Sequence, residues 1–225
     1  MPTPEQVFVA GMKSDLLSDW QPGKRFLVID EKASVVLRPA DGSFDNLKGK
    51  VISYIKVEPR RTPAGAEEAS ILFSGEGKIL YYTTGRSVAD SRREVSASDI
   101  PMLIDLDLVD KAARLLSGKK VWTMSSLWYD AADNLMRGVK FVPVTITGVT
   151  PGNKVFPLRV SFTDSGGMDA GMWMSVRSGG SQAGSGASRW FGNLFSLSDP
   201  RRGHPDMDDA VWEMICAGKV REGMT

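Results

Sequence analysis

The stretch Leu115-Leu116-Ser117-Gly118-Lys119-Lys120-Val121 has a close counterpart in the first part of the chain. There, Leu16-Leu17-Ser18 is followed after a short spacer by Gly23-Lys24-Arg25-Phe26. Both stretches join an apolar pair to a glycine, two basic residues and an apolar residue. This order is typical of a helix that ends at a glycine and leads into a strand. The repetition therefore predicts two related modules.

Further matches keep the same order in both halves of the chain, at a spacing of about 90 residues. They pair Leu47–Val51 with Met136–Lys140, Val57–Pro59 with Val149–Pro151, and Ile71–Ser74 with Leu158–Thr163, the last pair aligning Phe73 with Phe162. Each copy has room for a leading helix and several short strands. Such a unit suits a small barrel, because small barrels remove exposed sheet edges by closing on themselves.

The expected fold is mainly β (α+β), with two tandem SH3-like small barrels, each with a leading helix, and a C-terminal helix. The repeat places the first module at residues 1–98 and the second at residues 99–188. Residues 189–225 form a helical tail. A single larger sandwich or barrel, with one sheet shared by both repeats, is the alternative that the pattern leaves open.

Local patterns predict the individual elements. Residues 4–18 and 107–116 carry apolar side chains at helical spacing, with Asp107 as N-cap and Gly118 at the C-terminal end of the second helix. Residues 85–98 are charged and rich in turn formers, which predicts a loop. Strands are expected within residues 24–37, 51–57, 68–73, 78–83, 119–124, 140–149, 155–162 and 172–176. The glycines of Ser74–Gly77 predict a hairpin turn. Pro143 lies inside one of these strands and is expected to place it at an edge or bulge.

Composition excludes several classes of protein. The chain has 28 Lys+Arg against 27 Asp+Glu, which argues against a nucleic-acid binder or a polybasic membrane protein. One Cys and one His exclude an intramolecular disulfide and a multi-His metal site. No run of about 18 apolar residues exists, so we expect no membrane-spanning segment. The first residues also lack the basic and apolar regions of a signal peptide.

The end of the chain resembles a known repeat. Gly218-Lys219-Val220 followed by Gly223-Met224-Thr225 is similar to the opening of the repeat in small outer-membrane assembly lipoproteins and β-lactamase-inhibitor-like domains. In those proteins the Thr caps a helix, so the resemblance implies a chain that continues past Thr225. The tandem layout, with Trp128-Tyr129 and residues 141–152, resembles an uncharacterised family of exported bacterial proteins. This second resemblance implies a periplasmic or exported location and supplies no activity.

Two aromatic pairs, Tyr81-Tyr82 and Trp128-Tyr129, are the candidate ligand-binding residues. In a strand, neighbouring side chains point to opposite faces, so one ring of each pair should enter the core and the other should face outward. Outward rings on small barrels are suited to peptides or glycans. The alternative is that these rings cover the seam between modules or a leading helix. We expect a non-enzymatic binding or scaffolding protein of the bacterial envelope, whose partner is a peptide, a glycan or an envelope protein.

A hydrolase is the alternative function, using a Cys216/His204 pair or an acidic pair. Cys216 lies on the apolar side of a predicted helix and His204 in a predicted turn, positions that are usually structural. The acidic groups Asp105/Asp107/Asp110 and Asp206/Asp208/Asp209 stand at predicted helix starts, where capping and the helix dipole favour carboxylates without a metal. Gly75-Glu76-Gly77-Lys78 is not followed by a helix, as a phosphate-binding loop would be. We therefore expect no cofactor and no metal.

Overall fold

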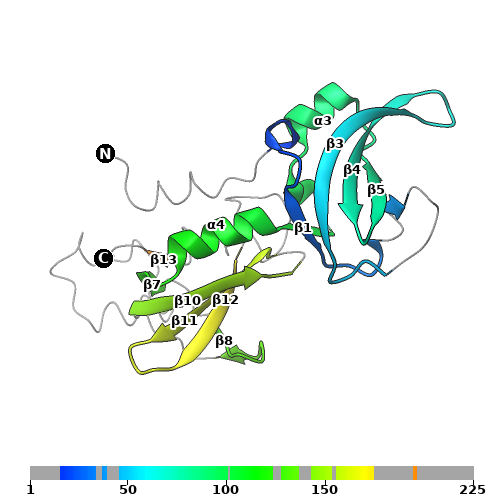
Figure 1. Cartoon of the computed structure of the whole chain (residues 1–225). Coiled ribbons are helices and arrows are strands. Elements are labelled where there is room, and N and C mark those ends of the chain that lie inside the picture. The colour runs from blue at the N-terminus through cyan, green and yellow to red at the C-terminus, as the bar shows by residue number, and fades with distance from the viewer. Residues whose placement is uncertain are drawn as a thin grey trace, which may run out of the picture. The chain divides into compact units, whose positions relative to one another are not determined.

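The computed structural model describes residues 16–33, 37–39, 46–100, 102–123, 128–136, 143–153, 156–174 and 195–196. The fold is mainly β, and the chain divides into two compact units between Val109 and Asp110 (Figure 1). We call the described residues before this point the N-terminal unit and those after it the C-terminal unit. The module limits predicted from the repeat, 1–98, 99–188 and 189–225, stay predictions.

The N-terminal unit contains a six-stranded antiparallel sheet with the order β2-β5-β4-β3-β1-β6. Its strands are β1 (Arg25–Val28), β2 (Arg38–Pro39), β3 (Val51–Arg61), β4 (Glu67–Gly75), β5 (Lys78–Thr83) and β6 (Leu103–Asp105). The long strand β3 bends over its neighbours, so that the sheet curls into a half-barrel (Figure 1). A bulge between Tyr54 and Lys56 contributes to this bend, because an extra residue on one strand increases the local twist.

Aromatic rings fill the hollow of this half-barrel. Phe26 and Phe73 are fully buried, and their ring centroids lie 5.7 Å apart in an edge-to-face arrangement. Trp20 packs against Phe26 at 4.9 Å and against Tyr54 at 5.3 Å. Edge-to-face contacts of this kind stabilise a core beyond the area they bury. The alternation of buried side chains along β1, β3 and β4 therefore brings these rings together in one aromatic cluster.

The predicted hairpin turn is confirmed. Gly75 at the end of β4 pairs with Lys78 at the start of β5, leaving Glu76 and Gly77 as a two-residue loop. Both loop residues have a positive φ, 51° and 75°, as a type I′ turn requires. Glycine suits the second position because it adopts this conformation without steric cost.

The loop predicted for residues 85–98 is wrong. This stretch contains helix α3 (Val88–Glu94) and the 3-10 helix η2 (Ala97–Asp99). Ser87 caps α3 by accepting a hydrogen bond from the Asp90 amide at 3.1 Å. The only buried residue of α3 is Ser91, whose hydroxyl lies 2.8 Å from that of Thr84. The helix carries no apolar stripe, so the periodicity that reveals other helices is missing.

The second predicted helix is present as α4 (Leu106–Leu116), but its predicted cap is wrong. The Leu108 amide donates to the Asp105 carboxylate at 3.0 Å, so Asp105 and not Asp107 caps the helix. Asp107 instead pairs with Arg25. Of the other predicted helices, residues 4–18 are described only at their end, where the 3-10 turn η1 (Leu17–Asp19) begins. Of the predicted helical tail 189–225, the structure describes only Phe195–Ser196, and these two residues form a strand. No helix in the described part of the chain is long and apolar enough to cross a membrane.

The C-terminal unit contains a seven-stranded antiparallel sheet with the order β13-β7-β10-β11-β12-β8-β9. Its strands are β7 (Lys120–Thr123), β8 (Trp128–Tyr129), β9 (Leu135–Met136), β10 (Pro143–Pro151), β11 (Leu158–Asp164), β12 (Asp169–Met174) and β13 (Phe195–Ser196). The strand that contains Pro143 is not at an edge, contrary to one of the two predicted alternatives, and its bulge lies between Ile146 and Gly148. Pro143 is the first residue of β10, which lies between β7 and β11, and a strand start tolerates the missing N–H.

The two sheets share their strand order. The order β6-β1-β3-β4-β5-β2 in one corresponds to β13-β7-β10-β11-β12-β8 in the other, with β9 added beyond β8. Both also carry a bulge near the start of their longest strand, after Tyr54 in β3 and after Ile146 in β10. In each, a glycine amide before the first strand donates to the residue preceding that bulge, Gly23 to Tyr54 and Gly118 to Ile146, both at 2.8 Å. No described strand belongs to both sheets.

Candidate binding surface

The four predicted aromatic residues divide between core and surface. Tyr82 packs against the core of the N-terminal unit, and burial raises its pKa above the ordinary value. Trp128 is buried in the C-terminal unit, where its ring centroid lies 5.0 Å from that of Phe162. Tyr81 and Tyr129 follow the opposite alternation and are partly exposed. Each predicted pair thus has one inward and one outward ring, whereas their role in ligand binding stays a prediction.

Tyr81 lies on the outer face of the half-barrel among apolar neighbours. Leu72 is directly opposite it on β4, and Ile79 precedes it by two residues on the same face of β5. Leu72 is partly exposed and Ile79 is 43% exposed. Arg38 on β2 is paired with Tyr81 from the other side. These residues form, together with Arg60, a surface that we call the Tyr81 face.

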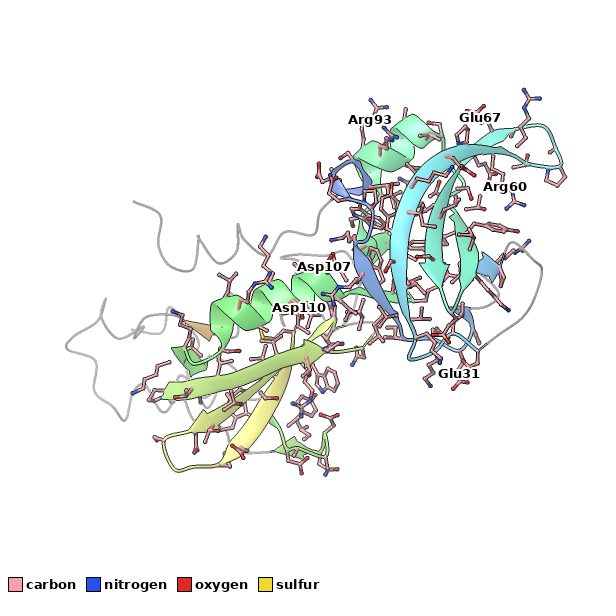
Figure 2. All side chains as sticks on the ribbon, viewed as in Figure 1. Glu31, Arg60, Glu67, Arg93, Asp107 and Asp110 are labelled. Atoms are coloured by element: carbon pink, nitrogen blue, oxygen red, sulfur yellow. The ribbon has the colours of Figure 1, made fainter. Side chains whose placement is uncertain are left out.

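Arg60 covers the ring of Tyr81. Its guanidinium carbon lies 4.2 Å from the ring centroid, a typical distance for a cation–π contact. Arg60 comes from the far end of β3, two strands away from β5, and the curl of the sheet brings it over the ring. Figure 2 labels Arg60 beside this part of the sheet.

The charges on the Tyr81 face are only partly neutralised. Lys56, opposite Leu72, forms an ion pair with Glu58 at 2.6 Å. Glu68 stands opposite Arg60 in the strand register. Neither Arg38 nor Arg60 forms an ion pair with a carboxylate of the described residues. Because a guanidinium is planar and weakly hydrated, these two groups are suited to bind an incoming anionic group.

The outer face of the C-terminal unit is organised around Arg159 on β11. Its guanidinium is held by Asp133, at 2.8 Å from Nε and 2.7 Å from Nη2. It also donates to the Asp130 carbonyl at 2.9 Å and to the Ser161 hydroxyl at 3.2 Å. Its carbon lies 5.6 Å from the ring centroid of Trp173. With 15% of its side chain exposed, Arg159 is held in place by the chain itself.

Gly171 provides the space for this arrangement. A Cβ atom at this position would collide with the Arg159 guanidinium and lie 3.0 Å from the Val160 carbonyl oxygen. Tyr129, the predicted outward residue of this unit, is opposite Gly171 on β8. A glycine at this point of β12 therefore marks a close approach of a side chain, as glycines inside strands often do.

The Asp130–Asn134 turn presents Asp133 to Arg159. The Asp130 carboxylate accepts hydrogen bonds from the amides of Ala132 and Asn134, both at 2.9 Å, and this closes the turn. The hydrogen bond from the Asn134 side chain is the largest cause that lowers the Asp130 pKa. Asp133 has a φ of 62°, a conformation that Asp tolerates better than most residues.

The remaining ionisable clusters have structural explanations. Lys24 and Asp105 form a buried ion pair at 2.8 Å, and Arg25 pairs with Asp107 at 3.1 Å. Within the described residues, no group of three or more His, Cys, Asp and Glu could hold a metal ion. Cys216 and His204, like the acidic group at 206–209, lie outside the described residues.

Sequence reasoning named Tyr81 as a candidate and named neither arginine. Arg60 and Arg159 carry no local motif, and their contacts follow from strand register, a bulge and a glycine on a neighbouring strand. Comparisons with protein-family models, with curated proteins and with solved structures found no match.

Proposed function

We propose that this chain is a non-enzymatic binding or scaffolding protein and that the Tyr81 face is its ligand-binding surface. The observation that carries the proposal is the Arg60 guanidinium over the Tyr81 ring, beside the partly exposed side chain of Leu72 and the exposed side chain of Ile79. Tyrosine and arginine are enriched among the residues that supply most binding energy in protein interfaces. An aromatic ring with adjoining apolar and cationic groups on a rigid sheet is such an anchor.

The proposal includes the architecture of two tandem SH3-like modules that arose by duplication. The common strand order and the corresponding bulges support it. So does the equivalent hydrogen bonding of Gly23 and Gly118. In the N-terminal unit, the β3–β4–β5 meander lies beside β1, which pairs with the last strand β6, and this closing pairing supports a small barrel.

The location and the kind of partner are part of the same proposal. A periplasmic or exported location follows from the resemblances of Trp128-Tyr129, residues 141–152 and the tail to bacterial envelope proteins. Partners in that compartment include extended peptides, glycans and other envelope proteins. A sheet face with one aromatic ring and flanking arginines suits each of them, so the experiment has to compare these classes.

Selection from a displayed peptide library, in parallel with a glycan array, tests the proposal. We expect ligands that bind the wild-type chain and are lost on Tyr81→Ala or Ile79→Ser. Val51→Ser is the matched control, because Val51 is similarly exposed at 47% and does not belong to the Tyr81 face. Failure to select any ligand, or ligands that bind equally well to Tyr81→Ala, would refute the proposal.

A further inference from the structure

The C-terminal unit displays a complete contact between an arginine, an aromatic ring and an acidic turn. Asp133, in the Asp130–Asn134 turn, accepts a hydrogen bond from Arg159 Nε on Oδ1 and forms an ion pair with Nη2 through the same oxygen, and the guanidinium lies beside Trp173 on β12. Hydrogen bonds between ionised groups are shorter and about twice as strong as those between neutral groups. The outer face of this sheet therefore binds a turn through its aspartate.

The strand register locates the corresponding place in the N-terminal unit. Leu80 is opposite Phe73, and Ala170 is opposite Phe162, so Tyr81 stands in its sheet where Gly171 stands in the other. At Gly171 the strand is bare and the guanidinium lies on it. At Tyr81 the strand supplies the ring itself, and Arg60 crosses from β3 to lie over it.

The two faces differ in what satisfies the guanidinium. Arg159 is engaged by a carboxylate, a carbonyl and a hydroxyl of its own unit. Arg60 has the aromatic contact but no ion pair with a described carboxylate, and Glu58 on the same face is already paired with Lys56. Arg38 beside Tyr81 adds a second guanidinium without such a pair. Among the described residues of the Tyr81 face, Arg38 and Arg60 form no ion pair with a carboxylate, although Glu58 and Glu68 lie on the same face.

We infer that the Tyr81 face binds an aspartate-bearing turn of a protein partner, with the carboxylate on Arg60 and the turn against Leu72 and Ile79 beside the covered ring of Tyr81. This inference rests on the proposed function and deepens it, because it names the chemistry of the ligand. The carboxylate of the partner takes the place that Asp133 takes on Arg159. In the C-terminal unit the Asp130–Asn134 turn of the chain itself already occupies the guanidinium, so this unit binds no such ligand. One chain therefore binds one partner turn.

The test uses the full chain and a synthetic peptide with the sequence of residues 129–135, Tyr-Asp-Ala-Ala-Asp-Asn-Leu. Amide shifts in ¹H–¹⁵N NMR spectra are followed during titration to millimolar peptide. We expect saturable shifts at Leu72, Ile79 and Tyr81. A second peptide with Asn in place of the later Asp should bind about tenfold more weakly, the change expected for losing one charge-assisted contact.

Variants of the chain separate the role of Arg60 from general charge. Arg60→Ala should abolish the shifts, whereas Arg61→Ala, which removes the same charge from the next exposed position, should leave them unchanged. Equal binding of the two peptides, or equal loss in the two variants, would overturn the inference. An oligogalacturonate, which is an acidic glycan, serves as a further probe. If it shifts the same amides and the acidic peptide does not, the inference is overturned and the proposed function is left intact.

Two further outcomes count against the inference. No shift at the Tyr81 face with any probe would overturn it, and the proposed function would then stand or fall on the library selection alone. Asp41 follows β2 in the sequence as Asp133 follows β8, and it lies outside the described residues. Peptide binding that appears only in Asp41→Asn would show that the chain fills the face itself, which contradicts a partner as the occupant.

Discussion

Replacing Lys24 by methionine removes one partner of a buried ion pair of the N-terminal unit. Lys24 Nζ lies 2.8 Å from Asp105 Oδ2, and the two side chains are 8% and 5% exposed. Methionine keeps most of the length and apolar surface of the lysine stem. The substitution therefore leaves the Asp105 carboxylate buried at the start of α4 without its cation.

The structure sets the size of the expected effect. Removing one partner of a buried pair costs about 3–5 kcal/mol, since an uncompensated charge remains away from water. Solvent screening reduces this little when both groups are less than a tenth exposed. A loss of this size is a large part of the roughly 5–15 kcal/mol that stabilises a typical domain. The double variant Lys24→Met/Asp105→Asn buries neither charge, so it should recover about 2 kcal/mol or more of the loss.

Urea denaturation provides the assay, with NMR signals of Phe26 and Ile52 reporting on the core of the N-terminal unit. Asp107→Asn is the matched control, because the neighbouring Arg25–Asp107 pair is 47% and 41% exposed and should contribute less than about 1 kcal/mol. If Lys24→Met costs no more than Asp107→Asn, or if the double variant is as unstable as the sum of the single ones, the reasoning is refuted.

Two other substitutions have defined outcomes. Gly171→Ala should displace the Arg159 guanidinium and lower the free energy of unfolding by about 1–3 kcal/mol. Amide hydrogen exchange in the Asp130–Asn134 turn should become faster, and an unchanged exchange rate would contradict this prediction. Burial raises the Tyr82 pKa above 10.0, so its contribution to stability is full below about pH 10 and is lost as the pH rises through the folded-state pKa. Tyr82→Phe should remove this part of the alkaline loss, as measured by urea midpoints from about pH 9 to pH 11.

Several elements could be predicted from the sequence because their signals are local. The glycines at 75 and 77 define a hairpin turn, and the apolar stripe of residues 108–116 defines a helix. Alternation along Tyr81-Tyr82 and Trp128-Tyr129 gives the inward and outward rings. In each case a few consecutive residues carry the information, and the rest of the fold agrees with it.

Other features depend on residues far apart in the chain. Helix α3 is held by a Ser87 cap and a hydroxyl contact to Thr84, neither of which produces a hydrophobic period. The competing caps Asp105 and Asp107 cannot be ranked without knowing that Lys24 lies beside the first. Arg60 reaches Tyr81 because a bulge and the sheet curl bring two non-adjacent strands together. Register and curvature are collective properties, so no short pattern predicts them.

The pairing of β1 with β6 has a consequence for the order in which the N-terminal unit folds. Phe26 pairs with Asp105, which closes a loop of 79 residues (105 minus 26), whereas β4 and β5 are joined by two residues. Closing a long loop costs more chain entropy than closing a short one, so local pairings form first. We therefore expect the β3–β4–β5 meander to form early and the β1–β6 seam to close last. Unfolding should begin at that seam, and weakening Lys24–Asp105 should accelerate unfolding more than it slows folding.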